Sequence, residues 1–66
     1  MEIVVNGENL QVPNGISIVA LLELLGISAR GVAVEVNREL VARAQHAECA
    51  LCGGDHVEIV TLVGGG

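Results

Sequence analysis

Any hydrophobic core that this chain forms has to be built without aromatic side chains, because its 66 residues include no Phe, Tyr or Trp. A chain of this size buries only about 60% of the surface that its unfolded form exposes. Hydrophobic residues nevertheless make up 52% of the sequence and charged residues only 17%, which is the opposite of a disordered composition. We therefore expect a single small domain whose core consists of Val, Leu, Ile and Ala.

The charge of the chain argues against a nucleic-acid partner. Eight acidic residues against three Arg give a net charge of -5. An acidic surface repels the phosphates of nucleic acids, and binding of single strands also relies on aromatic platforms, which are missing here. The same charge favours a basic protein partner.

The distribution of apolar residues and the two Cys indicate a cytoplasmic protein. No apolar run approaches the roughly 20 residues of a membrane span, so we predict no membrane association. Residues 1–10 carry an acid at the second position and lack the basic start of a signal peptide. Without a secretion signal, two Cys favour free thiols in a reducing compartment.

An Asn-Gly pair predicts a hairpin at the start of the chain. Asn6-Gly7 is the strongest short signal for a tight turn, because both central positions of that turn need positive φ. The segments on either side, residues 1–5 and 8–12, are therefore expected to form two antiparallel strands. Pro13 and the two residues after it end the second strand.

The segment from residue 16 to residue 26 is expected to be a helix. Ser17 can cap its first turn, and Gly26 can end it in a left-handed conformation. Helical spacing places four apolar residues on one face: Ile18, Leu21, Leu22 and Leu25. We expect this face, Leu21 and Leu25 included, to pack on the sheet.

Three further strands are predicted after the helix. Residues 31–37 alternate cleanly, with three Val on one face, and residues 39–42 are a candidate short strand. Residues 43–55 show no periodicity and are expected to be irregular, with a turn at Gly53-Gly54-Asp55. Residues 56–63 are the last strand, with Asp55 ending the turn and Glu58 on a solvated face of the sheet.

This order of elements predicts an α+β fold of the β-grasp, or ubiquitin-like, type. The helix supplies the long crossover that two parallel strands require, and it would cover one face of a mixed sheet of four or five strands. The last strand would lie centrally beside the first. We divide the chain into a β-grasp domain, residues 1–63, and a flexible Gly-Gly-Gly tail, residues 64–66.

The tail has a chemical interpretation and a trivial one. A carboxylate on Gly66 is an unhindered acyl group, and three successive Gly without Cβ atoms can thread a narrow channel into an active site. A carboxylate is a poor acyl donor, so a partner enzyme would have to activate it, for example as an acyl adenylate. Alternatively, the glycines are a frayed end or a cloning remnant.

Four stretches of the sequence resemble the ThiS family, the sulfur carriers of thiamine biosynthesis. They are "MEIVVNGE", "SIVALLELLGI", "VAVEVNRELV" and "GDHVEIVTLVGGG", and together the resemblance covers residues 1–66. It implies a carrier that is not an enzyme and binds no cofactor. By this resemblance an E1-like adenylyltransferase of the ThiF type uses ATP to adenylate Gly66. A persulfide enzyme supplies sulfur, Gly66 becomes a thiocarboxylate, and a thiazole synthase of the ThiG type accepts the sulfur.

Partner binding is expected at the residues that lead into the modified end. Leu62 and Val63 lie where contacts with the sheet should end, so part of their apolar area is expected to be exposed, as is common at interfaces. Gly64 and Gly65 would then lie in the channel that leads to Gly66.

The loop before the last strand departs from the family pattern and leaves a metal or redox site open. His46, Cys49, Cys52 and His56 are all zinc-type ligands, and Cys-x2-Cys is a familiar half-site. The four are closer together in the sequence than the ligands of most structural zinc sites. A redox pair would need a helix after its first Cys, which the sequence does not predict. In addition, Ala42 and His46 replace the usual Pro and aromatic residue of the family.

The residues alone leave three alternatives to a thiamine-type carrier. A carrier for molybdopterin or another product would use the same tail chemistry, although the length of 66 and the ending "VTLVGGG" favour the thiamine type. A small zinc or thiol-redox domain would use Cys49 and Cys52. A ubiquitin-like modifier is the third.

Overall fold

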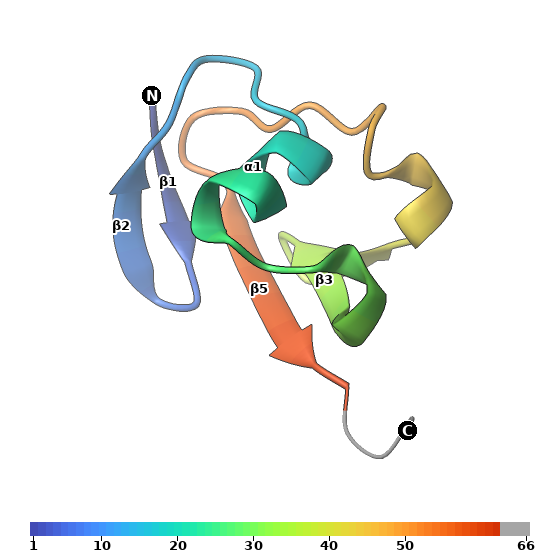
Figure 1. The fold of residues 1–66 in the computed structure, drawn as a ribbon. Helices are drawn as coiled ribbons and strands as arrows, with labels where there is room; N and C mark the ends of the chain where they lie inside the picture. Colours follow the sequence, from blue (N-terminus) through green and yellow to red (C-terminus); the bar gives the residue numbers. More distant parts are fainter. Residues whose placement is uncertain (63–66) are drawn as a thin grey trace.

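The computed structural model describes residues 1–62, which form a mixed sheet covered on one face by a helix (Figure 1). In chain order the elements are β1 (Glu2–Val5), β2 (Glu8–Gln11), α1 (Ile18–Leu25), the 3-10 helix η1 (Ala29–Gly31), β3 (Val32–Val36), β4 (Glu39–Val41), the 3-10 helix η2 (Arg43–Gln45) and β5 (His56–Thr61). The five strands are arranged in the order β2-β1-β5-β3-β4. The predicted β-grasp fold, with the last strand beside the first, is therefore confirmed.

The hairpin of β1 and β2 forms at the predicted Asn-Gly turn. Asn6 has φ 50° and Gly7 has φ 83°, so both central residues adopt the positive φ that a tight hairpin turn requires. The two strands pair antiparallel, with Ile3 opposite Leu10 and Val5 opposite Glu8.

The central strand is β5, which is hydrogen-bonded on both sides. It runs parallel to β1, with Val5 opposite Val57, and antiparallel to β3 over five residue pairs from Val32–Thr61 to Val36–Val57. The parallel pairing is possible because α1 and the rest of the chain provide the long crossover between these two strands. Figure 1 shows the end of β5 extending past the body of the domain.

Both predicted caps of α1 are confirmed. The backbone N–H of Ala20 donates to the Ser17 hydroxyl at 3.0 Å. At the other end Gly26 has φ 71°, its N–H donates to the carbonyl of Glu23, and the N–H of Ile27 donates to the carbonyl of Leu22. These two bonds form the Schellman motif, which satisfies carbonyls that the end of the helix leaves free.

The buried hydrophobic residues of the described part of the chain are all aliphatic. They are Ile3, Val12, Ile16, Ile18, Leu21, Leu22, Val34, Leu51 and Val57. One residue of the predicted helix face differs, because Leu25 is 36% exposed. Leu25 lies in the last turn of α1, where its side chain lines an open cavity rather than meeting a packed strand.

The irregular segment before β5 contributes more to the core than its sequence indicates. Leu51 is 2% exposed, and its N–H donates to the carbonyl of Ile16, while the N–H of Ile18 donates to the carbonyl of Cys49. These bonds attach the segment to the start of α1. Within the part of the chain that the structure describes, no helix is long and apolar enough to cross a membrane.

Two leucines of α1 provide a matched test of this packing. Leu21 is 0% exposed, and we expect Leu21→Ala to lower the free energy of unfolding by about 2–5 kcal/mol. A core of this size supplies only about 3–5 kcal/mol, so this variant should be partly unfolded at room temperature. Leu24 is 57% exposed, and the same change there should stay within about 0.5 kcal/mol. Urea denaturation of both variants measures the difference, and equal midpoints would contradict the orientation of α1.

Candidate functional site

The sheet holds the chain up to the last residue that the structure describes. Thr61 pairs with Val32, and the N–H of Leu62 donates to the carbonyl of Gly31 at 2.9 Å. Leu62 itself is 56% exposed, which confirms the predicted exposure of its apolar side chain. The other residues of the predicted site, Val63, Gly64, Gly65 and Gly66, lie outside the described part of the chain, as does the predicted tail 64–66.

Apolar side chains gather on the face of the sheet that α1 does not cover. Side chains alternate along β5, so buried Val57 faces α1 and Val60 faces away from it. Val60 is 50% exposed, Leu62 56% and Leu40 of β4 69%. We call these three residues the open-face patch. Val60 lies near the end of β5 and Leu62 directly follows that strand, whereas Leu40 lies on β4, across β3 from them.

Two carboxylates oppose each other across the same face. Glu35 of β3 is paired in register with Glu58 of β5 and also with Leu40 of β4. Like charges directly opposite each other on a sheet are destabilising. A cationic side chain placed between these carboxylates would relieve the repulsion, so this face suits a partner that combines apolar and basic groups.

The four predicted zinc-type ligands do not come together. His46 is buried at 2% exposure, Cys49 is half-buried, and Cys52 and His56 are exposed. Both thiols are free. Within residues 1–62, no three or more His, Cys, Asp or Glu side chains are placed to share a metal ion.

His46 is held as a packing residue of the irregular segment. Its Nε2 lies 3.1 Å from the carbonyl oxygen of Val41. A carbonyl can only accept, so Nε2 carries the proton and donates it. The other ring nitrogen, Nδ1, is buried and has no hydrogen-bond partner. The imidazole therefore connects the end of η2 to β4 by a hydrogen bond.

Asp55 has a structural role, as the sequence predicts. Its Oδ2 accepts from the N–H of Cys52 at 2.8 Å, and its Oδ1 accepts from Nδ2 of Asn37 at 3.1 Å. Asn37, with φ 51°, in turn accepts from the N–H of His56 at 2.9 Å. These bonds fix the turn that leads into β5, and Glu58 is exposed on the sheet as predicted.

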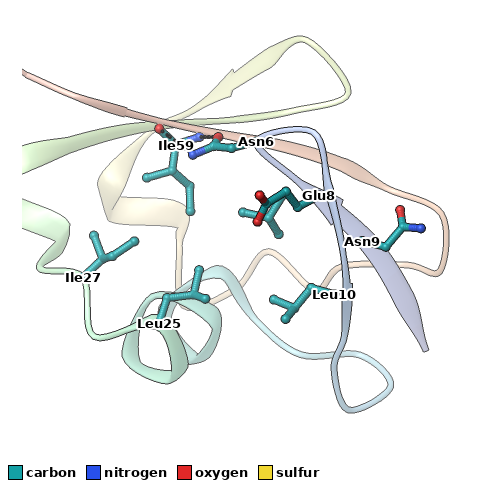
Figure 2. Close-up of a pocket in the computed structure, with 8 residues that line it drawn as sticks. Asn6, Glu8, Asn9, Leu10, Leu25, Ile27 and Ile59 are labelled. Atoms are coloured by element: carbon teal, nitrogen blue, oxygen red, sulfur yellow. Dashed lines mark hydrogen bonds between the residues drawn. The ribbon is translucent and has the colours of Figure 1, made fainter.

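A cavity of about 270 Å³ lies on the other side of β5, between the hairpin and the end of α1 (Figure 2). Its apolar lining comes from elements far apart in the sequence: Val5, Leu10, Leu25, Ile27 and Ile59. Sequence reasoning missed this feature because it assigned Leu25 to the core. The position of Leu25 in the last turn before Gly26 was the one available signal.

The chain matches one family profile over its whole length and one fifth of each of two longer curated proteins. The profile of the ThiS family matches residues 1–66. Two curated relatives are each named thiazole synthase. The protein from Paramagnetospirillum magneticum is 42% identical over 66 residues, and the one from Magnetococcus marinus is 36% identical over the same length. Each alignment covers 100% of this chain but only 20% of the relative, so the chain spans one fifth of their length.

Two solved structures show the same fold. The crystal structure of the thiamine biosynthesis protein ThiS from Geobacter metallireducens is 32% identical, with a TM-score of 0.89 and complete coverage of both chains. A solution structure of a thiamine biosynthesis protein from the same organism is 30% identical, with a TM-score of 0.79. That alignment covers 100% of this chain and 88% of the other.

The placement of the thiols leads to a prediction about metal and reactivity. Because the ligands are apart, protein purified without chelator should contain far less than one zinc per chain. Cys52 is exposed and Cys49 half-buried, so iodoacetamide should modify Cys52 first. Elemental analysis and peptide mass mapping measure the two effects. One zinc per chain that is lost when both Cys are changed to Ser would contradict this arrangement.

Proposed function

The chain belongs to the ThiS family, and from this premise we propose that it is a sulfur carrier of thiamine biosynthesis. The observation that carries the proposal is the fold match over the whole chain, in which the central strand leads directly to the Gly-rich end. In this role the chain is a co-substrate of other enzymes and has no catalytic residues of its own.

The chemistry that we propose takes place at the carboxylate of Gly66. An E1-like adenylyltransferase of the ThiF type transfers AMP from ATP to this carboxylate and releases pyrophosphate. The terminal sulfur of a persulfide on a partner enzyme then displaces AMP and forms an acyl disulfide with Gly66. A second thiol of the partner enzyme reduces this S–S bond, which releases Gly66 as a thiocarboxylate and leaves a disulfide on the partner. This carrier binds no cofactor of its own, because the partner enzyme holds the ATP. Bare glycines at positions 64 and 65 suit this chemistry because they pass through a narrow channel.

We propose that a thiazole synthase of the ThiG type accepts the sulfur. Support comes from the two relatives named thiazole synthase, in each of which a region similar to this chain forms about a fifth of the protein. Leu62, Val63, Gly64 and Gly65 would contact whichever enzyme holds the tail. The Glu35–Glu58 pair beside the open-face patch supports partners with basic surfaces.

The cytoplasm is the compartment in which this carrier would work. Cys49 and Cys52 are both free thiols in the structure, as expected for a protein from a reducing compartment. The adenylation step also needs a supply of ATP.

A change at the tail separates the proposed chemistry from the stability of the domain. Deletion of Gly66 should leave the thermal unfolding of residues 1–62 unchanged and abolish loading with sulfur. The new carboxylate would fall short of its position by as much as about 3.3–3.6 Å, which is large for a reaction that needs atoms within about 3 Å. Gly65→Val should block loading as well, because it adds bulk and restricts φ.

Intact mass spectrometry after incubation with the adenylyltransferase, ATP and a sulfur donor is the measurement. The parent should gain about 16 mass units as sulfur replaces oxygen on the acyl carbon. A chain with one Ala added after Gly66 should gain nothing. The double variant Cys49→Ser, Cys52→Ser should load like the parent. Loading of the Gly66 deletion at the parental rate would refute the proposed role of the tail, and loss of loading in the Cys variant would restore the thiol alternative.

A further inference from the structure

The cavity beside β5 has the form of a preorganised groove. Its floor and walls are the five apolar side chains of Val5, Leu10, Leu25, Ile27 and Ile59, and Glu8 lies at its edge. In Figure 2 the side chains of Leu10 and Leu25 lie across the groove from Ile59. Four of these side chains are partly buried and pack against the core, and Leu25 is 36% exposed. The groove is therefore apolar and open to a partner.

Asn6 fixes one wall of this groove to the central strand. The N–H of Ile59 donates to Oδ1 of Asn6 at 2.7 Å, and Nδ2 of Asn6 donates to the carbonyl of Ile59 at 3.3 Å. The side chain of Asn6 thus continues the β1–β5 ladder beyond the pair Val5–Val57. Because these bonds join residues far apart in the sequence, the hairpin cannot swing away from β5 without breaking them. A preformed site loses little conformational entropy when it binds.

The size and charge of the groove define its occupant. Pockets for small ligands usually enclose about 300–1,000 Å³. A cavity of about 270 Å³ is below that range and is suited to one or two aliphatic side chains of a protein. Glu8 is the charged residue of the lining, and none of Arg30, Arg38 and Arg43 contributes to it. The complementary surface therefore carries an aliphatic side chain next to Lys or Arg.

The groove and the open-face patch lie on opposite sides of the same strand. Ile59 faces the groove, whereas Val60 belongs to the patch. Ile59 lies only three residues before Leu62, which corresponds to about 10 Å along a strand. A partner that binds in the groove therefore lies close to Leu62, which is separated from the tail by one residue. Under the proposed function two enzymes use this tail in turn, and the two sides of β5 offer each of them a separate surface.

We propose that the groove is the docking site for thiazole synthase, which inserts an aliphatic side chain and places a Lys or Arg beside Glu8. The inference rests on the proposed function. Thiazole synthase is the chosen occupant because the relatives that carry this name contain a region similar to this chain within one polypeptide. In those proteins the region is covalently joined to the remaining four fifths, which keeps the two parts close together.

Two matched pairs of variants test the groove against purified thiazole synthase by isothermal titration calorimetry. Leu25→Gln and Glu8→Arg change the groove, whereas Leu24→Gln and Glu23→Arg make the same changes at exposed neighbours outside it. We expect the groove variants to raise Kd at least about tenfold and the controls to stay within about twofold. In about 1 M salt, where the Debye length is about 3 Å, the effect of Glu8→Arg should shrink and that of Leu25→Gln should persist.

The outcomes separate this inference from the proposed function. Three results would each overturn the docking site. The groove variants could bind with the Kd of the parent, the control variants could weaken binding as much as the groove variants, or the parent could fail to bind thiazole synthase. Loss of adenylation with unchanged Kd for thiazole synthase would also overturn it and assign the groove to the adenylyltransferase. Loading of Gly66 is measured without thiazole synthase, so that result tests the proposed tail chemistry separately. Binding of the parent to thiazole synthase tests the proposed acceptor, and the groove variants test the docking site alone. Far-UV circular dichroism and thermal unfolding verify that all four variants are folded.

Discussion

The pairing of β5 with both β1 and β3 is the interaction on which the rest of the structure depends. A strand that enters the sheet last and takes its centre closes the core, since Val57 is buried between the helix and its neighbours. The same pairing carries the chain outward in an extended conformation, with Leu62 still hydrogen-bonded to Gly31. The element that completes the fold is therefore also the element that leads to the end proposed to react. A defect in the core would disturb both.

The absence of aromatic side chains explains how the remaining elements are used. Aliphatic residues fill less space, so the small sheet and the single helix need additional cover from the segment between β4 and β5. Leu51 and His46 supply it, both at 2% exposure, although this segment has no periodic pattern. Where no such cover exists, at the end of α1, the apolar surface of Leu25 remains open and becomes part of the groove. The cavity is thus a consequence of the same composition that keeps the core small.

The sequence predicts those features that depend on residues close together along the chain. The positive φ of Asn6 and Gly7, the cap at Ser17 and the left-handed Gly26 follow from local chemistry, and all four were found. The strand order could also be inferred, because a helix between strands restricts the topology. The groove could not be predicted, since it depends on the contact of Asn6 with Ile59, 53 residues away. Helical periodicity likewise gives the face on which Leu25 lies but not whether another element reaches it.

Under the proposed function, recognition and reaction take place at different parts of the chain. The ionisable side chains of the described residues are either exposed, or engaged in turns and packing, as Asp55 and His46 are. Under the proposed function none of them needs to approach the carboxylate of Gly66, because an acyl group at the end of three glycines can be brought into the active site of another protein. The domain then has two physical requirements: it must hold the base of the tail rigidly, and it must be recognised. The hydrogen bonds of β5 meet the first requirement. The two apolar surfaces on either side of that strand, with Glu8 at the edge of the groove and Glu58 beside the open-face patch, provide a means to meet the second requirement with two successive partners.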